Sequence, residues 1–183
     1  MREIEIKLKA PNLKTIVSKL EKLGGVISEP KTQEDINFIH KDDTKWFEPT
    51  IGEWVYPRLR IQNDKSMIFT VKKPLKNEMD CMEHELHIDD PKELEAIMGM
   101  FGYKRGVRVK KTRRTCKFEK YTITLDEVEK LGTFIEIEQV VTDGDSIKMQ
   151  EEMFRFAENA FGLKRDDFVM KGYDILMHHL ENK

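Results

Sequence analysis

The sequence predicts an α+β domain in which an antiparallel sheet of eight strands is flanked by helices. Segments that alternate apolar and polar residues, the period of a strand, follow one another directly at several points along the chain. Successive parallel strands need a long crossover between them, so these runs favour an antiparallel sheet. The 183 residues contain no low-complexity linker and no break in composition, so we expect a single domain over residues 1–183.

Strand-like alternation recurs in eight segments of the chain. In the segment 105–115, Val107 and Val109 lie on the same face as Lys111, which leaves room for a bulge or a change of register. The expected strands cover residues 3–9, 34–40, 54–62, 66–73, 81–88, 105–115, 120–126 and 133–141.

Two of the four expected helices lie in the first two thirds of the chain. Residues 12–23 carry an apolar stripe at helical spacing that ends at Gly24, and glycine is a common helix terminator. A second helix is expected over residues 91–101. Asp90 precedes it, and Pro91 suits the first helical position because proline lacks the N–H that would be unpaired there.

The other two helices are expected near the C-terminus. Residues 144–161 form the third, with Asp143 or Asp145 as its N-cap and Gly162 as its end. Residues 166–180 form the fourth, because apolar side chains recur along them at helical spacing.

Composition narrows the class of protein. Charged residues make up 36% of the chain and apolar residues 39%, yet the net charge is only −2, which argues against disorder and against a surface that coats nucleic acid. The basic run over 104–117 is typical of a solvated face, so we expect no nucleic-acid partner. Cys81 and Cys116 lack metal-type spacing, and no signal region or apolar run of about 18 residues occurs. We therefore expect a cytoplasmic protein that does not enter a membrane.

The most informative feature is the charged face of the opening strand. Glu3, Glu5 and Lys7 share one face, while Ile4 and Ile6 share the other. Two carboxylates about 7 Å apart on a rigid strand repel each other unless a cation lies between them. Hard divalent ions such as Mg²⁺ prefer such oxygen ligands, and a neighbouring lysine suits an anion that the metal also contacts.

The same one-sided charge recurs on most of the other expected strands. The residues that share a polar face are Arg58 with Arg60, Thr70 with Lys72, Glu83 with Glu85 and His87, Lys111 with Arg113, Thr124 with Asp126, and Glu136 with Glu138. Such a face can simply be open to solvent. Alternatively, eight strands can close into a barrel wide enough for one small ligand, with the charges inside. Buried charges must be satisfied by one another, by water or by a ligand, and a triphosphate with Mg²⁺ would satisfy both sets.

Together these motifs resemble those of the CYTH, or triphosphate tunnel metalloenzyme, superfamily, and within it the class IV adenylyl cyclases. The opening Glu-Ile-Glu-Ile-Lys is similar to the ExExK signature of that superfamily. The other matching segments, in order, are 59–62, 70–72, 83–85, 111–113 and 131–138. The resemblance implies an eight-stranded antiparallel β-barrel, the triphosphate tunnel, with flanking helices.

The resemblance also implies roles for particular residues. Metal, as Mg²⁺ or Mn²⁺, would be held by Glu3, Glu5, Glu136 and Glu138, with Asp126 and Glu85 as helpers. Triphosphate would be gripped by Lys7, Arg58, Arg60, Lys72, Lys111 and Arg113. Glu5, Glu136 and Lys7 would be the catalytic residues. One departure is Gln62, which stands where the family motif has a second arginine, and Arg58 on the same strand face can substitute for it.

The shared motif is compatible with two reactions. In a class IV adenylyl cyclase, the ribose 3′-hydroxyl attacks the α-phosphorus of ATP, and cyclic AMP and pyrophosphate result. In a triphosphatase, water attacks the terminal phosphorus of inorganic, thiamine or nucleoside triphosphate. The cyclase is ranked first, and a non-catalytic nucleotide or polyphosphate-binding module is a third alternative. The resemblance also allows a homodimer.

An aromatic cluster lies between the second and third expected strands. Trp46, Phe47, Trp54 and Tyr56 are close in sequence. Packing at a tunnel mouth is the favoured interpretation, and stacking on the ring of a substrate is the alternative.

Overall fold

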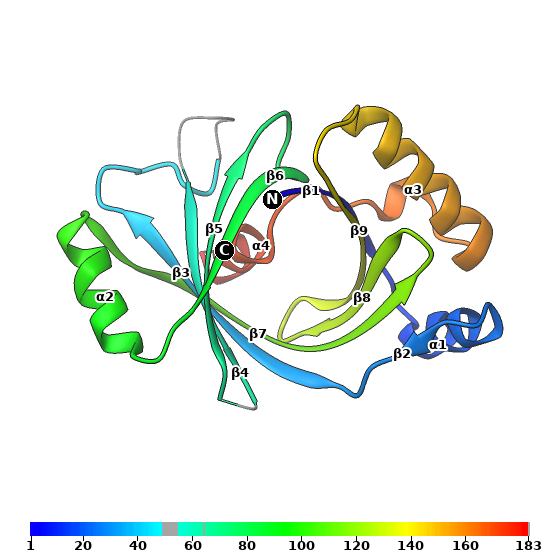
Figure 1. The fold of residues 1–183 in the computed structure, drawn as a ribbon, viewed down its shortest axis with the longest axis horizontal. Helices are drawn as coiled ribbons and strands as arrows, with labels where there is room; N and C mark the ends of the chain where they lie inside the picture. The colour runs from blue at the N-terminus through cyan, green and yellow to red at the C-terminus, as the bar shows by residue number, and fades with distance from the viewer. Residues whose placement is uncertain (49–54, 64, 183) are drawn as a thin grey trace.

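The computed structural model describes residues 1–48, 55–63 and 65–182 of the chain (Figure 1). Part of the predicted third strand, with Trp54, lies outside these ranges. These ranges contain nine strands: β1 (Arg2–Lys9), β2 (Val26–Ile27), β3 (Lys31–His40), β4 (Tyr56–Gln62), β5 (Met67–Pro74), β6 (Asp80–His87), β7 (Tyr103–Phe118), β8 (Tyr121–Val128) and β9 (Gly132–Val141).

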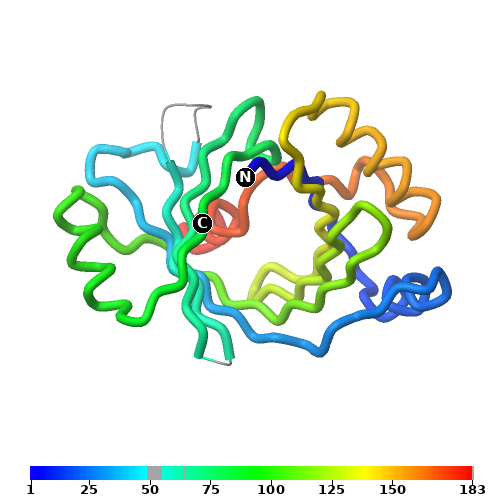
Figure 2. The backbone as a smooth tube through the Cα atoms, viewed as in Figure 1, coloured from blue at the N-terminus to red at the C-terminus, as the bar shows by residue number. Residues whose placement is uncertain are grey.

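Eight of these strands form a closed antiparallel barrel, as predicted. The order around it is β7-β3-β4-β5-β6-β1-β9-β8, and β8 pairs again with β7 to complete the ring. The long strand β7 makes closure possible, because Lys31–His40 of β3 pair with one side of it and β8 pairs with the other. The two-residue strand β2, which the sequence did not predict, pairs with the far end of β7 at Cys116 and Lys117. Figure 2 shows the strands surrounding a central opening.

The bulge that the valines of β7 suggested is present. The pairing register between β3 and β7 shifts by one residue between Ile36 and Phe38. Gly106 lies at this shift, where a Cβ atom would overlap the side chain of Ile39. Below the shift, Val109 and Lys111 of β7 both face the barrel interior.

We expect Gly106→Ala to destabilise the protein by about 1–3 kcal/mol, because the added methyl must displace Ile39. Gly99→Ala is the matched control. Gly99 is an exposed helical residue with no atom near the position of its absent Cβ, so that change should stabilise by up to about 1 kcal/mol. Thermal unfolding of the two variants would measure both effects. Equal melting temperatures for the two variants would contradict the role given to Gly106.

The helices are α1 (Leu13–Lys22), α2 (Pro91–Met100), α3 (Ser146–Phe161) and α4 (Tyr173–Glu181). The predicted caps are confirmed: the side chains of Asp90 and Asp145 accept backbone N–H groups at the starts of α2 and α3, and Gly162 ends α3 with φ of 73°. None of the helices in the described part of the chain has the length and apolarity needed to cross a bilayer.

The apolar faces of the strands point outward, and the helices cover most of them. Helices α1 and α3 pack on the outer face of β1, β8 and β9, where Ile4, Ile6, Ile123 and Ile137 are fully buried (Figure 1). Helix α2 covers β3 and β4 at the other side of the barrel. Helix α4 lies behind the opening, where it contacts β7. The polar faces are therefore left to line the interior.

The prediction of one helix over 166–180 was wrong in its first half. Residues Arg165–Asp167 form a single 3₁₀ turn, and Phe168 then pairs with Leu8 of β1, while the backbone N–H of Val169 donates to the carbonyl of Lys7. The reason is that β6 pairs only with Arg2–Ile4, which leaves Lys7 and Leu8 of β1 without a partner from β6 on that side. An extended segment satisfies these backbone groups and a helix could not.

Candidate functional site

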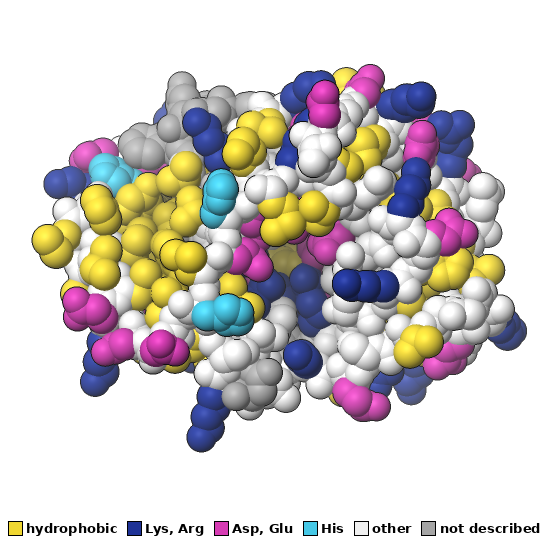
Figure 3. All heavy atoms as spheres, in the orientation of Figure 1, with side chains coloured by type: hydrophobic (Ala, Val, Ile, Leu, Met, Phe, Trp, Pro, Cys, Tyr) yellow, Lys and Arg dark blue, Asp and Glu magenta, His cyan; other side chains and the backbone are white. Residues whose placement is uncertain are grey.

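The barrel interior holds a cavity of about 310 Å³, and most of the residues that line it are charged or polar. Figure 3 shows acidic and basic side chains gathered in the central hollow. The predicted site residues that line this cavity are Glu3, Glu5, Lys7, Arg58, Arg60, Lys72, Glu85, Lys111, Arg113, Glu136 and Glu138. Strand alternation explains this convergence, because each of these residues shares a face with the others of its own strand.

Three carboxylates at the β1–β9 seam carry more negative charge than their surroundings balance. Glu5 and Glu138 are direct cross-strand partners, and Glu3 precedes Glu5 on the same face. Burial raises the pKa of all three. The pKa of Glu3 rises to about 8, helped by its hydrogen bond with Glu83, and that of Glu138 to about 7, helped by Glu5 and Glu136. A cation placed among these oxygens would relieve this repulsion.

Glu136 is held differently from the other acids. It accepts hydrogen bonds from Arg113 Nη2 at 2.5 Å and Thr124 Oγ1 at 3.2 Å, and Lys7 Nζ lies 3.5 Å away. Although burial alone would raise the pKa of Glu136, Arg113 and Lys7 lower it well below its usual range. Glu136 is therefore ionised throughout the physiological pH range, and it fixes the positions of the Arg113 and Lys7 side chains.

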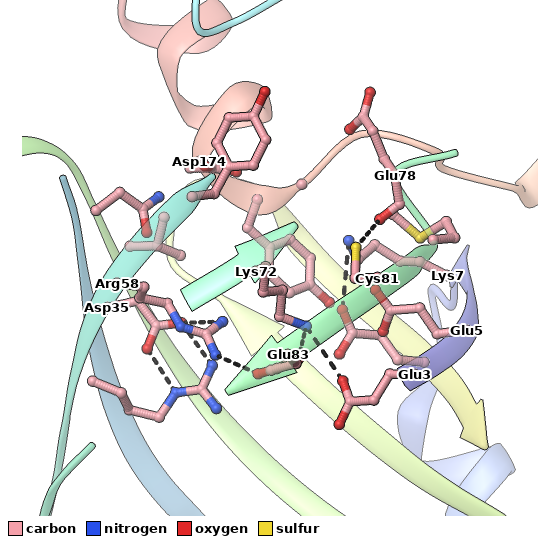
Figure 4. A pocket seen from close by; sticks show the side chains of 18 of the residues that line it. Glu3, Glu5, Lys7, Asp35, Arg58, Lys72, Glu78, Cys81, Glu83 and Asp174 are labelled. Atoms are coloured by element: carbon pink, nitrogen blue, oxygen red, sulfur yellow. Dashed lines mark hydrogen bonds and ion pairs between the residues drawn. The ribbon is translucent and has the colours of Figure 1, made fainter. Parts of the chain in front are cut away.

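Lys72 joins the acidic seam to β6. Its Nζ lies 2.6 Å from Glu83 and 3.4 Å from Glu3, and Figure 4 shows it directed between them. Burial by itself would raise the pKa of Glu83, but Lys72 lowers that pKa to about 2. The sequence analysis noted the position of Glu83 but gave it no role. Its neighbour Glu85 lies at the mouth of the cavity, exposed, where it accepts a hydrogen bond from Thr70 at 3.1 Å.

Asp35 on β3 is the centre of the basic side, and the sequence analysis missed it. Both its oxygens accept from Arg60, at 2.7 Å from Nε and 2.9 Å from Nη2, and one also accepts from Lys111 Nζ at 2.9 Å. Arg58 lies 3.7 Å away. Burial by itself would raise the pKa of Asp35, but Lys111 and Arg60 lower that pKa far below its usual range. Burial lowers the pKa of Lys111 to about 8, with Asp35 opposing that shift.

Asp126 on β8 holds Arg113 in the same way. Its oxygens accept from Arg113 Nε at 2.7 Å and Nη2 at 2.5 Å, and the hydroxyl of Tyr173 donates to it at 3.0 Å. Asp126 is fully buried and is not among the residues that line the cavity. The structure thus places it behind Arg113, so that it reaches the cavity only through that arginine.

Gln62 lies beyond this set of charges. Its side chain accepts a hydrogen bond from Gln33 at 3.3 Å and donates one to Ser66 at 3.0 Å, and it does not line the cavity. Arg58, by contrast, reaches the cavity as the sequence analysis expected, although both lie on the same strand face.

One end of the cavity is formed by the start of α4, which the sequence analysis did not assign to the site. The ring of Tyr173 lies 4.3 Å from Lys7 Nζ, and Asp174 and Glu78 line the cavity nearby. The aromatic cluster packs against helix α4. The ring centroids of Trp46 and Phe47 lie 4.9 and 4.6 Å from that of His178. Packing is thus confirmed for these two rings. Tyr56 lines the cavity, and Trp54 lies outside the described residues.

Within the described residues, no three potential ligand side chains are already arranged around a common point. The donor chemistry nonetheless suits a hard divalent cation, because Glu3, Glu5 and Glu138 offer carboxylate oxygens whose charge is incompletely balanced.

We expect Glu138→Gln to stabilise the metal-free protein at pH 8. The pKa of Glu138 is raised on folding, so the stability associated with its protonated form is present below about pH 4.5 and is lost as the pH rises through about 7. The neutral amide removes that loss, and the melting temperature in EDTA should rise by a few degrees at pH 8 and not at pH 4. Mg²⁺ should then stabilise the variant less than the natural protein. The same pH profile for both proteins would contradict this assignment.

The fold and the site together define a class: a closed barrel whose interior opposes a carboxylate seam to a cluster of arginines and lysines. The comparisons with known proteins agree, since the CYTH domain family model matches residues 1–173. The chain belongs to the CYTH family.

Relatives of known name or structure align with nearly the whole chain. A Methanocaldococcus jannaschii protein named "Putative adenylate cyclase MJ0240" is 30% identical over 94% of this chain and 97% of its own length. The structure of PH1819 from Pyrococcus horikoshii OT3 is 29% identical, has a TM-score of 0.78 and is aligned over 99% of both chains. A Hippeastrum protein, HpAC1, shares the fold at 16% identity and a TM-score of 0.61, over 100% of this chain and 96% of its own. Its structure is described as revealing a dominant triphosphatase activity.

Proposed function

We propose that this protein is a metal-dependent enzyme that acts on triphosphates inside the barrel, and that it is a class IV adenylyl cyclase forming cyclic AMP and pyrophosphate from ATP. The observation that carries the proposal is the barrel cavity, in which carboxylates whose charge is incompletely balanced face Arg60, Lys111 and Arg113. A triphosphate with a divalent cation has the charge distribution that this lining complements. The name of the Methanocaldococcus relative supports the cyclase.

The residues of the chain would divide the work by charge. Arg60, Lys111, Arg113, Lys72 and Lys7 would orient the phosphates and offset the charge that develops on the leaving group. Arg60 and Arg113 already use Nε and Nη2 on aspartates, so each would present its remaining Nη1 group to an oxygen of the substrate. Lysines can reach other oxygens as mobile point charges.

Mg²⁺ or Mn²⁺ would be held by Glu3, Glu5 and Glu138 with Glu136, and when bound would supply charge neutralisation and activation of the attacking oxygen. Glu5, Glu136 and Lys7 are the proposed catalytic residues. Because Asp126 is engaged by Arg113 and Tyr173, we assign it to positioning that arginine, and Glu85 to the mouth.

A triphosphatase is the second candidate, and the activity described for the Hippeastrum neighbour favours considering it. The same grip on the phosphates would serve, with water in place of the ribose hydroxyl as the attacking group. In the non-catalytic alternative, the carboxylate seam would take part in binding only, and no product would form.

Phosphorus NMR of the products from ATP, inorganic triphosphate and thiamine triphosphate, each with Mg²⁺ or Mn²⁺, tests the proposal. Cyclic AMP with pyrophosphate is the expected result. Orthophosphate without a cyclic product would make the protein a triphosphatase, and the preferred substrate would identify its kind. Binding of all three without any product would overturn an enzymatic role.

A further inference from the structure

Tyr173, the first residue of α4, is a neutral side chain set among the charges of the cavity. The centroid of its ring lies 4.3 Å from Lys7 Nζ and 5.2 Å from Lys111 Nζ. Its hydroxyl donates a hydrogen bond to Asp126 at 3.0 Å, and Asp126 in turn accepts two hydrogen bonds from Arg113. Three of the cations that line the cavity therefore meet at this one residue, two at its ring and one through Asp126.

The Tyr173 ring is held in a fixed position. Phe134 packs edge-on against it with the ring centroids 5.1 Å apart, and Tyr173 is buried. Burial raises the pKa of Tyr173 well above its usual range, so its hydroxyl stays protonated and can donate. The segment that leads into α4 is also tied to β1, because the backbone N–H of Val169 donates to the carbonyl of Lys7 at 2.9 Å, and Lys7 Nζ donates to the carbonyl of Lys171 at 3.3 Å. The ring thus offers a rigid surface to the flexible lysine side chains.

An aromatic ring orders a lysine in a different way from a carboxylate. The face of the ring attracts an ammonium group through its quadrupole, but the ring has no net negative charge. Asp35, which accepts from Lys111 at 2.9 Å, holds that lysine and also offsets its charge. Glu136, the carboxylate beside Lys7, is farther away at 3.5 Å. The Tyr173 ring can therefore hold both lysines in place and leave their positive charge available to an anion.

We propose that Tyr173 is a positioning residue, whose ring orders Lys7 and Lys111 for the phosphates of the substrate before the substrate enters. This inference rests on the proposed function of the cavity. A lysine side chain loses rotamer freedom when it grips a phosphate, and that loss weakens binding. Because the ring already restricts both side chains, part of the loss occurs on folding instead. Tyr173 acts on the affinity for the phosphate chain through the cations that contact it.

Isothermal titration calorimetry with inorganic triphosphate and Mg²⁺ tests this role in the whole protein. Tyr173→Leu removes the ring and should raise the dissociation constant by about 10-fold or more. Tyr173→Phe keeps the ring and removes only the hydrogen bond to Asp126, so the dissociation constant should rise by about 3-fold or less. Circular dichroism spectra of both variants should match that of the natural protein.

Met177→Ala is the control for a general loosening of α4. Met177 is buried in the same apolar cluster as Tyr173, but it does not line the cavity. The melting temperature of this variant should fall, because a cavity is left in the core, while triphosphate binding should be retained. Equal weakening by Tyr173→Leu and Tyr173→Phe would assign the effect to the hydroxyl, and equal weakening by Met177→Ala would assign it to helix packing. Either result, or unchanged binding by Tyr173→Leu, would overturn the proposal.

NMR of the lysine side chains tests the ring contacts without any triphosphate. Protons above the face of an aromatic ring are shifted upfield, so the ε-methylene signals of Lys7 and Lys111 should be shifted in the natural protein and in Tyr173→Phe, but not in Tyr173→Leu. Lys120, whose Nζ lies 5.3 Å from the ring centroid of Tyr121, is an internal reference that should keep its shift in every variant.

The two measurements separate this inference from the proposed function. Ordinary shifts for both lysines in the natural protein would overturn the positioning role, whatever the protein binds. Failure of the natural protein to bind any triphosphate would overturn the proposed function, and with it the purpose given to Tyr173, even if the shifts were present.

Discussion

Replacing Glu5 by glutamine is expected to reduce metal-dependent turnover of triphosphates by at least about 10²-fold while the protein stays folded. Glu5 lies at the centre of the carboxylate seam, opposite Glu138 and close to Glu136, and burial raises its pKa. Its negative charge therefore costs stability in the metal-free protein, a cost that the proposed role in holding the cation would explain. Initial rates with saturating Mg²⁺ and thermal unfolding in EDTA would measure the two effects.

The control is Glu127→Gln, the same chemical change on the outward face of β8, which should leave the rate unaltered. Glu136→Gln should also abolish turnover, but for a further reason. It withdraws the partner of Lys7 and Arg113, so it should lower stability where Glu5→Gln raises it. Full activity of both Glu5→Gln and Glu136→Gln would contradict the assignment of the metal site.

Arg60→Ala is expected to raise the dissociation constant for inorganic triphosphate by about 10–100-fold, the loss of one charge-assisted hydrogen bond of about 1.5–3 kcal/mol. The fold should survive, because Asp35 keeps Lys111 at 2.9 Å and Arg58 nearby. Isothermal titration calorimetry with the natural protein and the variant would give both constants. Lys72→Ala should weaken binding in the same direction.

Arg108→Ala provides the matched control. It removes the same charge from the adjacent part of the barrel, but Arg108 points outward, pairs with Glu34 and is exposed. Its effect on the dissociation constant should be small and should disappear at high salt. If both arginine variants bound triphosphate like the natural protein, the cationic cluster could not be the grip on the substrate.

Strand periodicity accounts for most of what the sequence predicted correctly. Side chains of a strand alternate between faces, so the position of Glu5 fixes those of Glu3 and Lys7 without knowledge of the rest of the fold. The same rule placed Lys111 and Arg113 on one face of their strand, and in the structure both line the interior of the barrel. Helix caps were equally readable, because Asp90 and Asp145 act on residues two or three positions away.

Contacts between distant segments were not readable in this way. Asp35 follows Glu34 on β3 with nothing in the local sequence to mark it, and its importance comes from its contacts with Arg60 on β4 and Lys111 on β7. Tyr173 belongs to the site because an extended segment, anchored at Leu8, delivers α4 to the end of the cavity. Asp126 has the right type and face for a metal ligand, but only the structure shows that Arg113 lies in front of it.

Because Arg60 is paired with Asp35 and Arg113 with Asp126, an anion that enters the barrel must compete with a carboxylate for each arginine. Each cation already has a carboxylate partner, so an incoming anion gains only the difference between its own attraction and the one it weakens. A monoanion such as chloride or acetate would engage one cation and gain little. A chain of linked phosphates would contact several of these cations at once. The favourable free energies of these contacts add, while the translational freedom of the molecule is lost only once. The barrel would thus discriminate by the number of connected charges in a molecule, before any group attached to the phosphates is recognised.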